Sequence, residues 1–271
     1  KKLIEGDIGI IGPNYGTHAC GDIGYGRMTN PEQIIEKIKY KEKTAELQGK
    51  KILVTAGPTR EPIDPVRFMS NYSSGKMGYE IAIAAKKMGA YVKMISGPVS
   101  LKPIKDVDTE YVETSDEMYQ AVMSNIEEFN VLISTAAIAD YKPVDYSHSK
   151  HKKSENDISI RFTRGIDIIS AVSSKYDDVY TVGFAAETDS LHANAIDKLQ
   201  KKNLSMIVGN IANHELKLGF ESDFNRVKIF SKKQTIDLPK AKKSDIAKSI
   251  LKAIADELSS NKMKLVNKDV K

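Results

Sequence analysis

GKMGYEIAIAAKKMGAYVKMIS, residues 75–96, is the stretch that decides the fold class of this chain. Its first part places apolar residues at helical spacing and ends at Gly89, a residue type that commonly closes helices. Its second part, YVKMIS at residues 91–96, is a short apolar run that is typical of a buried strand. The stretch therefore predicts a helix that leads directly into a strand.

Strands and helices of this kind alternate along most of the chain. A strand, KILVTA, is predicted at 51–56, before the opening stretch. Further strands are predicted at 109–115, 131–137, 180–187 and 204–210, a late hairpin at 226–231 and 234–239, and helices at 116–129 (capped by Ser115), 189–203 and 242–259 (capped by Ser244 or Asp245). This alternation predicts an α/β fold with a Rossmann-like doubly wound, mostly parallel sheet, helices on both faces and a late β-hairpin. Because such sheets bind ligands at the carboxyl ends of their strands, the residues that follow strands are the site candidates.

The composition limits the covalent chemistry and the partners of the chain. Of its 271 residues, 41% are hydrophobic and 28% are charged; the net charge is +5 and there is no tryptophan. Cys20 is the single cysteine, which excludes an intrachain disulfide and a cysteine zinc site and is typical of a reducing compartment. No apolar run reaches the roughly 20 residues of a membrane span. We expect a cytoplasmic protein that has neither a membrane nor a nucleic acid as partner.

SNYSSGKMG, residues 70–78, is the candidate phosphate-binding segment. A Walker loop requires G-x-x-x-x-G-K-[ST], whereas the glycine and lysine here are followed by Met77. The dinucleotide fingerprint G-x-G-x-x-G is also missing. Two interpretations remain: a capped helix start, or a helix N-terminus that offers hydroxyl and amide groups to an anion from Ser73, Ser74 and Gly75.

The loop that precedes this helix, residues 57–74, is longer than most loops in α/β units, and such long loops are more often functional. It carries two arginines, an aspartate and an asparagine: Arg60, Arg67, Asp64 and Asn71. Arginines beside a helix N-terminus favour a phosphorylated, carboxylate-bearing ligand. A solvated loop with Arg–Asp pairs is the alternative that the residues leave open.

Four motifs together resemble one family of enzymes. They are TAGPTREPIDPVRFMSNYSSGKMG (55–78), AAIADYKP (136–143), VGFAAET (182–188) and KKNLSMIVGN (201–210). Over roughly residues 50–258 the chain resembles the bacterial phosphopantothenoylcysteine synthetases, the ligase half of the bifunctional coenzyme A biosynthesis protein. The resemblance implies a ligase domain at 50–258. For residues 259–271, which are rich in lysine, we expect a basic, disordered tail.

The first 49 residues resemble a different part of the same bifunctional protein. THACGDIGYGRM, residues 17–28, is similar to the substrate-clamp segment at the end of the decarboxylase half, where the cysteine donates a proton. The resemblance implies that residues 1–49 are a decarboxylase remnant with a linker, including a helix at 31–43. Because the flavin-binding body is not part of this sequence, we expect Cys20 to be inert here, with no decarboxylase activity, and FMN to bind only to the intact bifunctional protein.

The family reaction joins 4′-phosphopantothenate to L-cysteine at the expense of CTP. The resemblance implies that the carboxylate and CTP form an acyl-cytidylate, that pyrophosphate leaves, and that the cysteine amine then displaces CMP. Such chemistry requires a divalent cation, Mg²⁺ or Mn²⁺, on the phosphates and no protein nucleophile. This agrees with a sequence in which no Ser/His/Asp or Cys/His set stands out. Since eukaryotic relatives favour ATP, the preference for CTP stays open.

The resemblance also assigns roles to individual residues, although it identifies no metal ligands. Asn71, Arg67 and Lys150 are the catalytic candidates. Lys150 belongs to SKHKKSEND, residues 149–157, which resembles the mobile flap of the family. The flap departs from the family pattern, so Lys152 is the alternative flap lysine, and His148 and His151 are expected to be solvated. The expected CTP-binding residues are Ser134, Thr135, Ala136, Asp140, Lys150, Ile166, Asp167, Ile168, Ile169, Phe184, Lys198 and Lys202. The expected phosphopantothenate-binding residues are Asn71, Ser73, Ser74, Gly75 and Ala137.

The loop RGIDII, residues 164–169, is a second departure from the family, and two rival functions remain. Where the family commonly has Asn-Pro, this chain has Gly165 and Ile166, a replacement that can loosen the loop. A nucleotide-dependent oxidoreductase on a similar sheet would need the missing glycine fingerprint. A non-catalytic nucleotide-binding module is the second rival. The resemblance further implies a homodimer in which one protomer completes the phosphopantothenate pocket of the other, and a larger oligomer for the full-length protein.

Overall fold

The structure is a computed structural model that describes residues 10–17, 20–36, 45–150, 158–187, 191–211 and 222–266. It divides into two compact units, Lys1–Glu46 and Leu47–Lys271. Within the described parts, no helix combines the length and the apolar character that crossing a bilayer requires.

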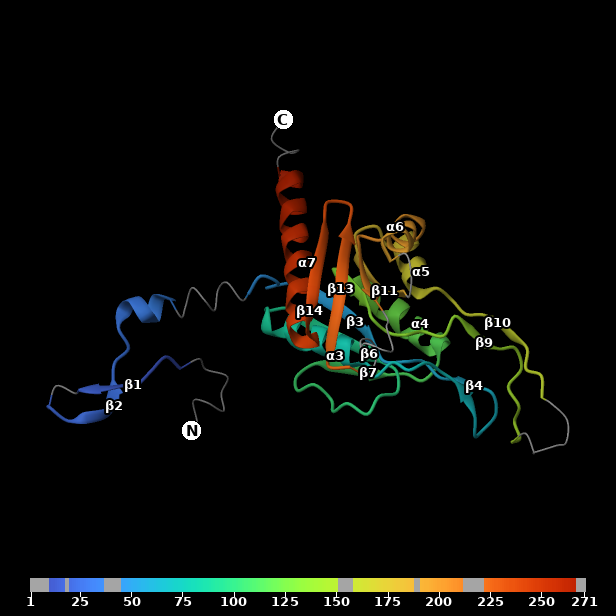
Figure 1. Ribbon diagram of the computed structural model, residues 1–271, viewed down its shortest axis with the longest axis horizontal. Coiled ribbons are helices and arrows are strands. Elements are labelled where there is room, and N and C mark those ends of the chain that lie inside the picture. The colour runs from blue at the N-terminus through green and yellow to red at the C-terminus, as the bar shows by residue number, and fades with distance from the viewer. Residues whose placement is uncertain are drawn as a thin grey trace. The chain divides into compact units, whose positions relative to one another are not determined.

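The larger unit is built on a sheet of eight strands in the order β14-β13-β12-β11-β8-β3-β6-β7 (Figure 1). Their bounds are β3 (Lys51–Ala56), β6 (Tyr91–Ser96), β7 (Asp108–Tyr111), β8 (Val131–Ser134), β11 (Tyr180–Glu187), β12 (Met206–Ile211), β13 (Phe224–Ser231) and β14 (Thr235–Lys242). Within the sheet, the six neighbouring strands β7, β6, β3, β8, β11 and β12 pair in parallel. Strands β13 and β14 add an antiparallel hairpin at the edge beside β12. The predicted fold class is therefore confirmed.

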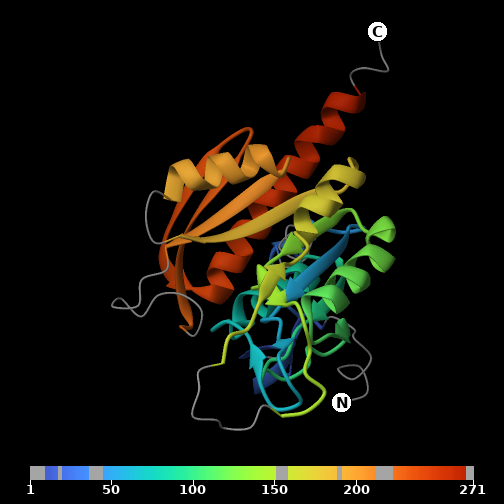
Figure 2. The same ribbon diagram turned by 90° about the vertical axis from the view of Figure 1, so that its right-hand side faces the viewer.

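Helices cover both faces of this sheet, as Figure 2 shows from the side. One face packs against α3 (Lys76–Lys87) and α7 (Lys243–Val266), and the other against α4 (Ser115–Asn125) with its 3-10 extension η1 (Ile126–Glu128), α5 (Ile168–Lys175) and α6 (Leu191–Lys201). Side chains of the central strand alternate between the two cores: Ile52 and Val54 point to the first and Leu53 to the second, all fully buried. Burial on both faces is why these strands are nearly continuous apolar runs.

Two predicted helix caps are wrong. Helix α4 is capped by Thr114 instead of Ser115: the Thr114 hydroxyl accepts a bond from the Glu117 amide at 3.2 Å, and the Glu117 carboxylate accepts one from the Thr114 amide at 3.4 Å. This reciprocal capping box satisfies two amides, whereas a cap at Ser115 would lack the glutamate three residues later. Helix α7 starts at Lys243, directly after β14, so Ser244 and Asp245 lie inside its first turn.

Helix α7 also ends later than predicted. It continues to Val266 and so enters the segment for which a disordered tail was predicted. Residues 259–266 contain neither glycine nor proline, the two residue types that most often stop a helix. Residues 267–271 lie outside the described residues.

Two small antiparallel pairs were not predicted. They are β4 (Glu61–Pro62) with β5 (Phe68–Met69), and β9 (Tyr141–Pro143) with β10 (Phe162–Arg164). The strand pairs contact each other through β4 and β9, and the amide of Ser147 donates to the carbonyl of Ile63 at 3.0 Å. We call these four strands with their described connections the arm; Figure 1 shows it projecting from the sheet.

The smaller unit contains one hairpin and the start of one helix. Strands β1 (Asn14–Thr17) and β2 (Ile23–Arg27) pair antiparallel, and the rings of Tyr15 and Tyr25 meet edge to face at 5.2 Å. Cys20 is exposed between these strands. The helix predicted at 31–43 is present at residues 31–36, and residues 37–44 lie outside the described part.

Candidate functional site

A cavity of about 430 Å³ lies at the carboxyl ends of the central strands. The chain leaves β3 towards one sheet face, through α3, and leaves β8 towards the other, through α5, so the strand order reverses between β3 and β8. Doubly wound sheets bind their ligands at this switch point. The cavity is lined from the start of α3, the segments 134–140 and 165–169, strand β11, two lysines near the end of α6, and residues of β12, β13 and α7.

The first turn of α3 forms one wall of the cavity. Gly75 precedes the helix with a positive φ of 75°, and a Cβ there would lie 2.7 Å from Cγ1 of Val99. At Gly78, a Cβ would lie 2.6 Å from Cβ of Ala56, so only glycine lets α3 lie this close to β3. No side chain caps the helix by a hydrogen bond. Since Ser73 and Gly75 line the cavity, the positive end of the α3 dipole faces it.

Asn71 ties the α3 loop to the loop after β8. Its Nδ2 donates to the carbonyl of Ala137, and its Oδ1 accepts from the amide of Ser73 at 3.0 Å. Ser73 and Ala137 both line the cavity, although Asn71 itself does not. Asn71 therefore holds together two segments that contribute to the cavity.

The loop after β8 is fastened to the loop after β3 by backbone bonds. The amide of Ala137 donates to the carbonyl of Gly57 at 2.9 Å, and the amide of Thr59 donates to the carbonyl of Ala137 at 3.2 Å. The hydroxyl of Thr59, a fully buried residue, accepts from the amide of Ala139 at 3.0 Å. These bonds fix the backbone of residues 135–140 along the cavity.

One end of the cavity, which we call the acidic end, is organised by Asp167. This residue caps α5 by accepting from the amide of Ser170 at 3.2 Å, and its Oδ2 lies 2.8 Å from Nζ of Lys202. Burial alone would raise the pKa of Asp167, but bonds to Lys202 and Ser170 outweigh it and hold the pKa below the usual value. The Asp167 carboxylate is therefore charged at neutral pH beside the cavity.

The glycine that departs from the family pattern is held by a backbone bond. The amide of Gly165 donates to the carbonyl of Asp140 at 2.8 Å, and a Cβ at this position would lie 3.0 Å from the carbonyl oxygen of Ala139. Glycine thus allows the chain to approach the β8 loop closely. The bond to Asp140 restrains the loop at residues 164–169, which the replacement by Gly165 and Ile166 was expected to loosen.

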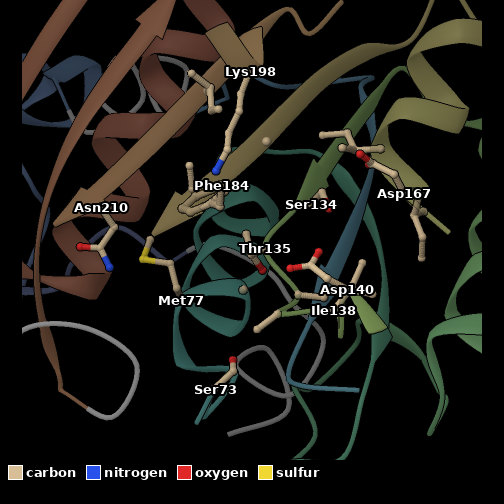
Figure 3. Close-up of a pocket in the computed structure, with 18 of the residues that line it drawn as sticks. Ser73, Met77, Ser134, Thr135, Ile138, Asp140, Asp167, Phe184, Lys198 and Asn210 are labelled. Atoms are coloured by element: carbon tan, nitrogen blue, oxygen red, sulfur yellow. The ribbon is translucent and has the colours of Figure 1, made fainter. Parts of the chain in front are cut away.

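The opposite end, which we call the cationic end, was not predicted. It consists of four cavity-lining residues: Lys76, Asn210, Asn225 and Lys243. Nζ of Lys76 lies 2.6 Å from Oδ1 of Asp223. Burial and the nearby Lys76 lower the pKa of Lys243 to about 8, against the opposing effect of Asp223. In Figure 3, Asn210 and Met77 lie on one side of the cavity and Asp167 on the other, with Thr135, Phe184 and Lys198 between them.

Most of the predicted site residues line this one cavity. The lining includes Ser73, Gly75, Ser134, Thr135, Ala136, Ala137, Asp140, Ile166, Asp167, Ile168, Ile169, Phe184, Lys198 and Lys202. Asn71 and Ser74 adjoin it in the chain without lining it. The motif KKNLSMIVGN ends at Asn210, so the carboxyl-end rule applied to β12 was the signal that could have found this residue.

Three predicted residues lie elsewhere. Arg67 belongs to the arm, where its guanidinium lies 3.7 Å from the buried Asp64. Lys150 is exposed on the arm, and the alternative Lys152 lies outside the described residues, as does His151. Cys20 belongs to the smaller unit.

The described residues contain no group of three His, Cys, Asp or Glu side chains that could hold a metal by itself. Among the cavity-lining residues, the carboxylates are Asp140 and Asp167, and Asp167 is paired with Lys202. Mg²⁺ at nucleotide sites is held largely by phosphates and water, with one or two protein carboxylates. The donor set fits such an ion, with Asp140 as its protein ligand, and the expected Mg²⁺ or Mn²⁺ stays a prediction.

The strand order and the position of the cavity define a doubly wound α/β domain of the Rossmann type. Residues 47–258 match the family model of the DNA/pantothenate metabolism flavoprotein C-terminal domain, and the chain belongs to this family.

The relatives carry a common name. The chain is 41% identical over 248 residues to the coenzyme A biosynthesis bifunctional protein CoaBC of Vibrio vulnificus, covering 90% of this chain and 62% of the relative. It is 42% identical over 252 residues to the protein of that name from Haemophilus influenzae, covering 92% and 62%. The crystal structure of the C-terminal domain of a CoaBC matches with a TM-score of 0.69 at 41% identity, covering 80% of this chain and 99% of that one.

These matches confirm the predicted resemblance to the ligase half of the bifunctional protein. The chain spans about 62% of the length of the two curated relatives. What the whole relatives do therefore enters only as a proposal.

Proposed function

We propose that this chain catalyses the CTP-dependent ligation of 4′-phosphopantothenate and L-cysteine to 4′-phosphopantothenoylcysteine, a step of coenzyme A biosynthesis. The observation that carries the proposal is a cavity at the switch point, which gathers a helix N-terminus, a fixed β8 loop and the two lysines Lys198 and Lys202. The names of the relatives, coenzyme A biosynthesis proteins, support the same pathway.

In the first half-reaction, a carboxylate oxygen of phosphopantothenate attacks the α-phosphorus of CTP and pyrophosphate leaves. The first turn of α3 offers a positive dipole end, and Lys198, another lining residue, offers an ammonium group. A divalent ion on the phosphates, with Asp140 as its protein ligand, would neutralise further charge when bound. No step requires a protein nucleophile.

In the second half-reaction, the cysteine amine attacks the acyl carbon, a C–N bond forms and the bond to CMP breaks. Negative charge then develops on the acyl oxygen, and a preorganised N–H donor stabilises it. Asn71 is suited to this role, because an amide has two N–H donors and only one donates to Ala137. Its bond to the Ser73 amide fixes the orientation of the side chain.

We propose a homodimer that forms through the arm. Large apolar side chains are exposed there: Val66, Phe68, Tyr141, Val144, Tyr146, Ile158, Ile160 and Phe162. Large apolar side chains gathered in the exposed parts of one projecting element favour an interaction site there. Because Arg67 lies on this arm and does not line the cavity of its own protomer, we further propose that it serves the cavity of the partner.

The test is pyrophosphate release with CTP, phosphopantothenate and Mg²⁺, followed by product formation on addition of cysteine. Parallel reactions with ATP, GTP and UTP determine the nucleotide preference. Pyrophosphate release that depends on phosphopantothenate supports the ligase. A nicotinamide absorbance change would indicate an oxidoreductase instead, and nucleotide binding without turnover would indicate a binding module.

A further inference from the structure

The cationic end of the cavity contains buried polar side chains that the predicted site does not use. Lys243 is 4% exposed, Asn225 is 3% exposed and Asn210 is 9% exposed, and all three line the cavity. Burying an ammonium group or an amide is costly unless polar or charged groups compensate. A buried lysine beside a cavity places positive charge where water screens it little, which favours an anionic ligand in that cavity.

We propose that Lys243 and Lys76 bind the β- and γ-phosphates of the nucleotide, and that the amides of Asn210 and Asn225 add hydrogen bonds to the same group. The cationic end is then the subsite of the pyrophosphate leaving group. This proposal rests on the proposed ligase reaction, and it names residues that neither the motifs nor the family resemblance assigned.

The layout of the cavity supports a nucleotide bound with its nucleoside at the acidic end and its β- and γ-phosphates at the cationic end. Asp167 and Lys202 lie at the acidic end, where the nucleoside is expected, and Asn210 lies across the cavity from Asp167 (Figure 3). Lys76 is the first residue of α3, so its ammonium group and the helix dipole act on the same region. A triphosphate that runs from the acidic end past the start of α3 reaches Lys243.

Positive charge extends beyond the cavity itself. Lys76 and Lys243 also line a neighbouring cavity of about 670 Å³, to which Lys102, Lys105 and Lys242 contribute. Two carboxylates, Glu80 and Asp223, share that lining, so five lysines face two acids. A concentration of like charge beside a cavity raises the local potential and favours anions there.

The amides at this end are suited to contact phosphate oxygens. Asn225 accepts from the amide of Arg226 through Oδ1 at 3.0 Å, which fixes the side-chain orientation and leaves its NH₂ group on the other side. Oδ1 of Asn210 is buried and has no hydrogen-bond partner within the described part of the chain. A half-turn of the Asn210 amide would put its NH₂ group in the place of this unpartnered oxygen, where it can donate to a ligand.

The chemistry gives these residues a catalytic task. When the carboxylate oxygen bonds to the α-phosphorus, the bond from that phosphorus to the bridging oxygen breaks and leaves its electron pair on pyrophosphate. The departing pyrophosphate therefore gains one negative charge that the bound triphosphate did not carry. Two ammonium groups at the β- and γ-phosphates stabilise this charge as it develops.

The protonation of Lys243 supports a role as an anion ligand. With its pKa lowered to about 8, Lys243 is mostly charged at pH 7 and loses its proton as the pH rises towards 9. The titratable groups that act on it are Lys76 from α3 and Asp223 from the segment before β13; β12 and β13 contribute the amides Asn210 and Asn225. Pyrophosphate affinity should therefore fall above pH 8 in the wild type and fall less in Lys243→Arg, whose guanidinium stays charged.

The decisive experiment is calorimetric binding of inorganic pyrophosphate, CMP and 4′-phosphopantothenate, each in Mg²⁺ buffer, to the wild type and to Lys243→Met. We expect pyrophosphate to bind roughly 10- to 100-fold more weakly to Lys243→Met, as for the loss of a charge-assisted hydrogen bond. CMP and phosphopantothenate should bind as to the wild type. Lys252→Met, at an exposed position of the same helix, is the matched control and should change none of the three.

Three outcomes overturn the proposal. Lys243→Met could bind pyrophosphate as tightly as the wild type does, could lose affinity for phosphopantothenate alone, or could lose affinity for all three ligands equally. If Lys243→Met does not fold, Lys76→Met, at a partly exposed position, is judged by the same criteria. Binding is measured without turnover. A wild type that binds as expected yet fails to ligate would refute the ligase function and leave the pyrophosphate subsite standing.

Discussion

Lys202 and Asp167 are joined by an ion pair of 2.8 Å between Nζ and Oδ2, which fastens the end of α6 to the start of α5 beside the cavity. Because both residues line the acidic end, we expect the pair to position the nucleoside without taking part in bond formation. Lys202→Met should raise the KM for CTP roughly tenfold, as for loss of one hydrogen bond to a charged group, and change kcat little. Steady-state kinetics with varied CTP measures both, with the exposed Lys201→Met as control. A fall in kcat at unchanged KM would contradict this role.

The same pair makes a prediction about acid stability. The pKa of Asp167 lies below its usual value, so its charged form is favoured by folding. A depressed carboxyl pKa contributes stability that is fully present above the unfolded pKa, near 4, and is lost as the pH falls through the folded pKa. Asp167→Asn should therefore destabilise the protein at pH 7 and make a smaller difference at pH 3. Urea unfolding at both pH values measures this, with the exposed Asp178→Asn as control.

Tyr180 and Glu257 form a buried hydrogen bond that we expect to serve stability alone. The Tyr180 hydroxyl donates to Oε2 of Glu257 at 2.8 Å, and Oε1 has no partner within the described part of the chain. Tyr180→Phe leaves the buried carboxyl without this donor and should cost about 1–3 kcal/mol of unfolding free energy. Urea unfolding at pH 7 measures the loss, and Tyr91→Phe, at an exposed tyrosine, should cost little. Since Tyr180 does not line the cavity, a changed affinity for CTP would contradict this interpretation.

Burial raises the pKa of Tyr180, and the Glu257 carboxylate raises it further. A raised tyrosine pKa contributes stability that is present below the unfolded pKa, near 10, and is lost as the pH rises beyond it. The cost of Tyr180→Phe should therefore shrink above pH 10.

The sheet could be predicted because its central strands are buried on both faces. KILVTA and YTVGFAAE are continuous apolar runs, and strand β11 has the predicted bounds Tyr180–Glu187. The arm could not be predicted in the same way. Its strands are two or three residues long, include Pro62 and Pro143, and expose much of their apolar surface, so they lack both length and periodicity.

Residues of the candidate site could be predicted where they belong to a motif that resembles the family. Ser73, Asp140 and Lys202 belong to motifs that resemble the family, and the structure brings these residues to one cavity. Lys243 looked like one lysine of a basic helix start. Its place in the cavity depends on the packing of α7 against α3 and β13, a non-local arrangement that no short pattern encodes.

Asn71→Asp and Lys150→Gln should impair different half-reactions. Asn71→Asp places a carboxylate beside the Ala137 carbonyl and the developing charge on the acyl oxygen, so attack by cysteine should slow by roughly 10²–10³. Its first half-reaction should persist, with about one equivalent of pyrophosphate released in a single turnover without cysteine. Lys150→Gln should release little, because it removes a point charge assigned to the triphosphate.

The burst experiment uses Tyr72→Phe as its control, since Tyr72 is 82% exposed next to Asn71. A pyrophosphate burst from Lys150→Gln and none from Asn71→Asp would reverse the two roles. A full burst from both variants would show that Lys150 is not needed at the triphosphate. Lys76 and Lys243 would then be the lysines proposed to activate CTP.

Arg67 and Asn71, four residues apart in the chain, should act in different active sites of one dimer. Asn71 bonds to two cavity-lining residues of its own protomer, whereas Arg67 lies on the arm, away from that cavity. In a heterodimer of Arg67→Ala with Asn71→Asp, the protomer that keeps Asn71 would receive an intact Arg67 from its partner. That site would be complete and the other would lack both groups.

Mixing the two inactive variants should therefore restore activity. With random exchange, half of the dimers are mixed and each has one complete site of two, so about a quarter of the wild-type activity should return. The mixture is denatured and refolded together, and each variant refolded alone is the control. If Arg67 acts in its own protomer, every site in the mixture carries one lesion and no activity returns. An additional Phe162→Asp substitution in both variants, which puts a charge on the exposed apolar face of the arm, should abolish the recovery and yield monomers in light scattering.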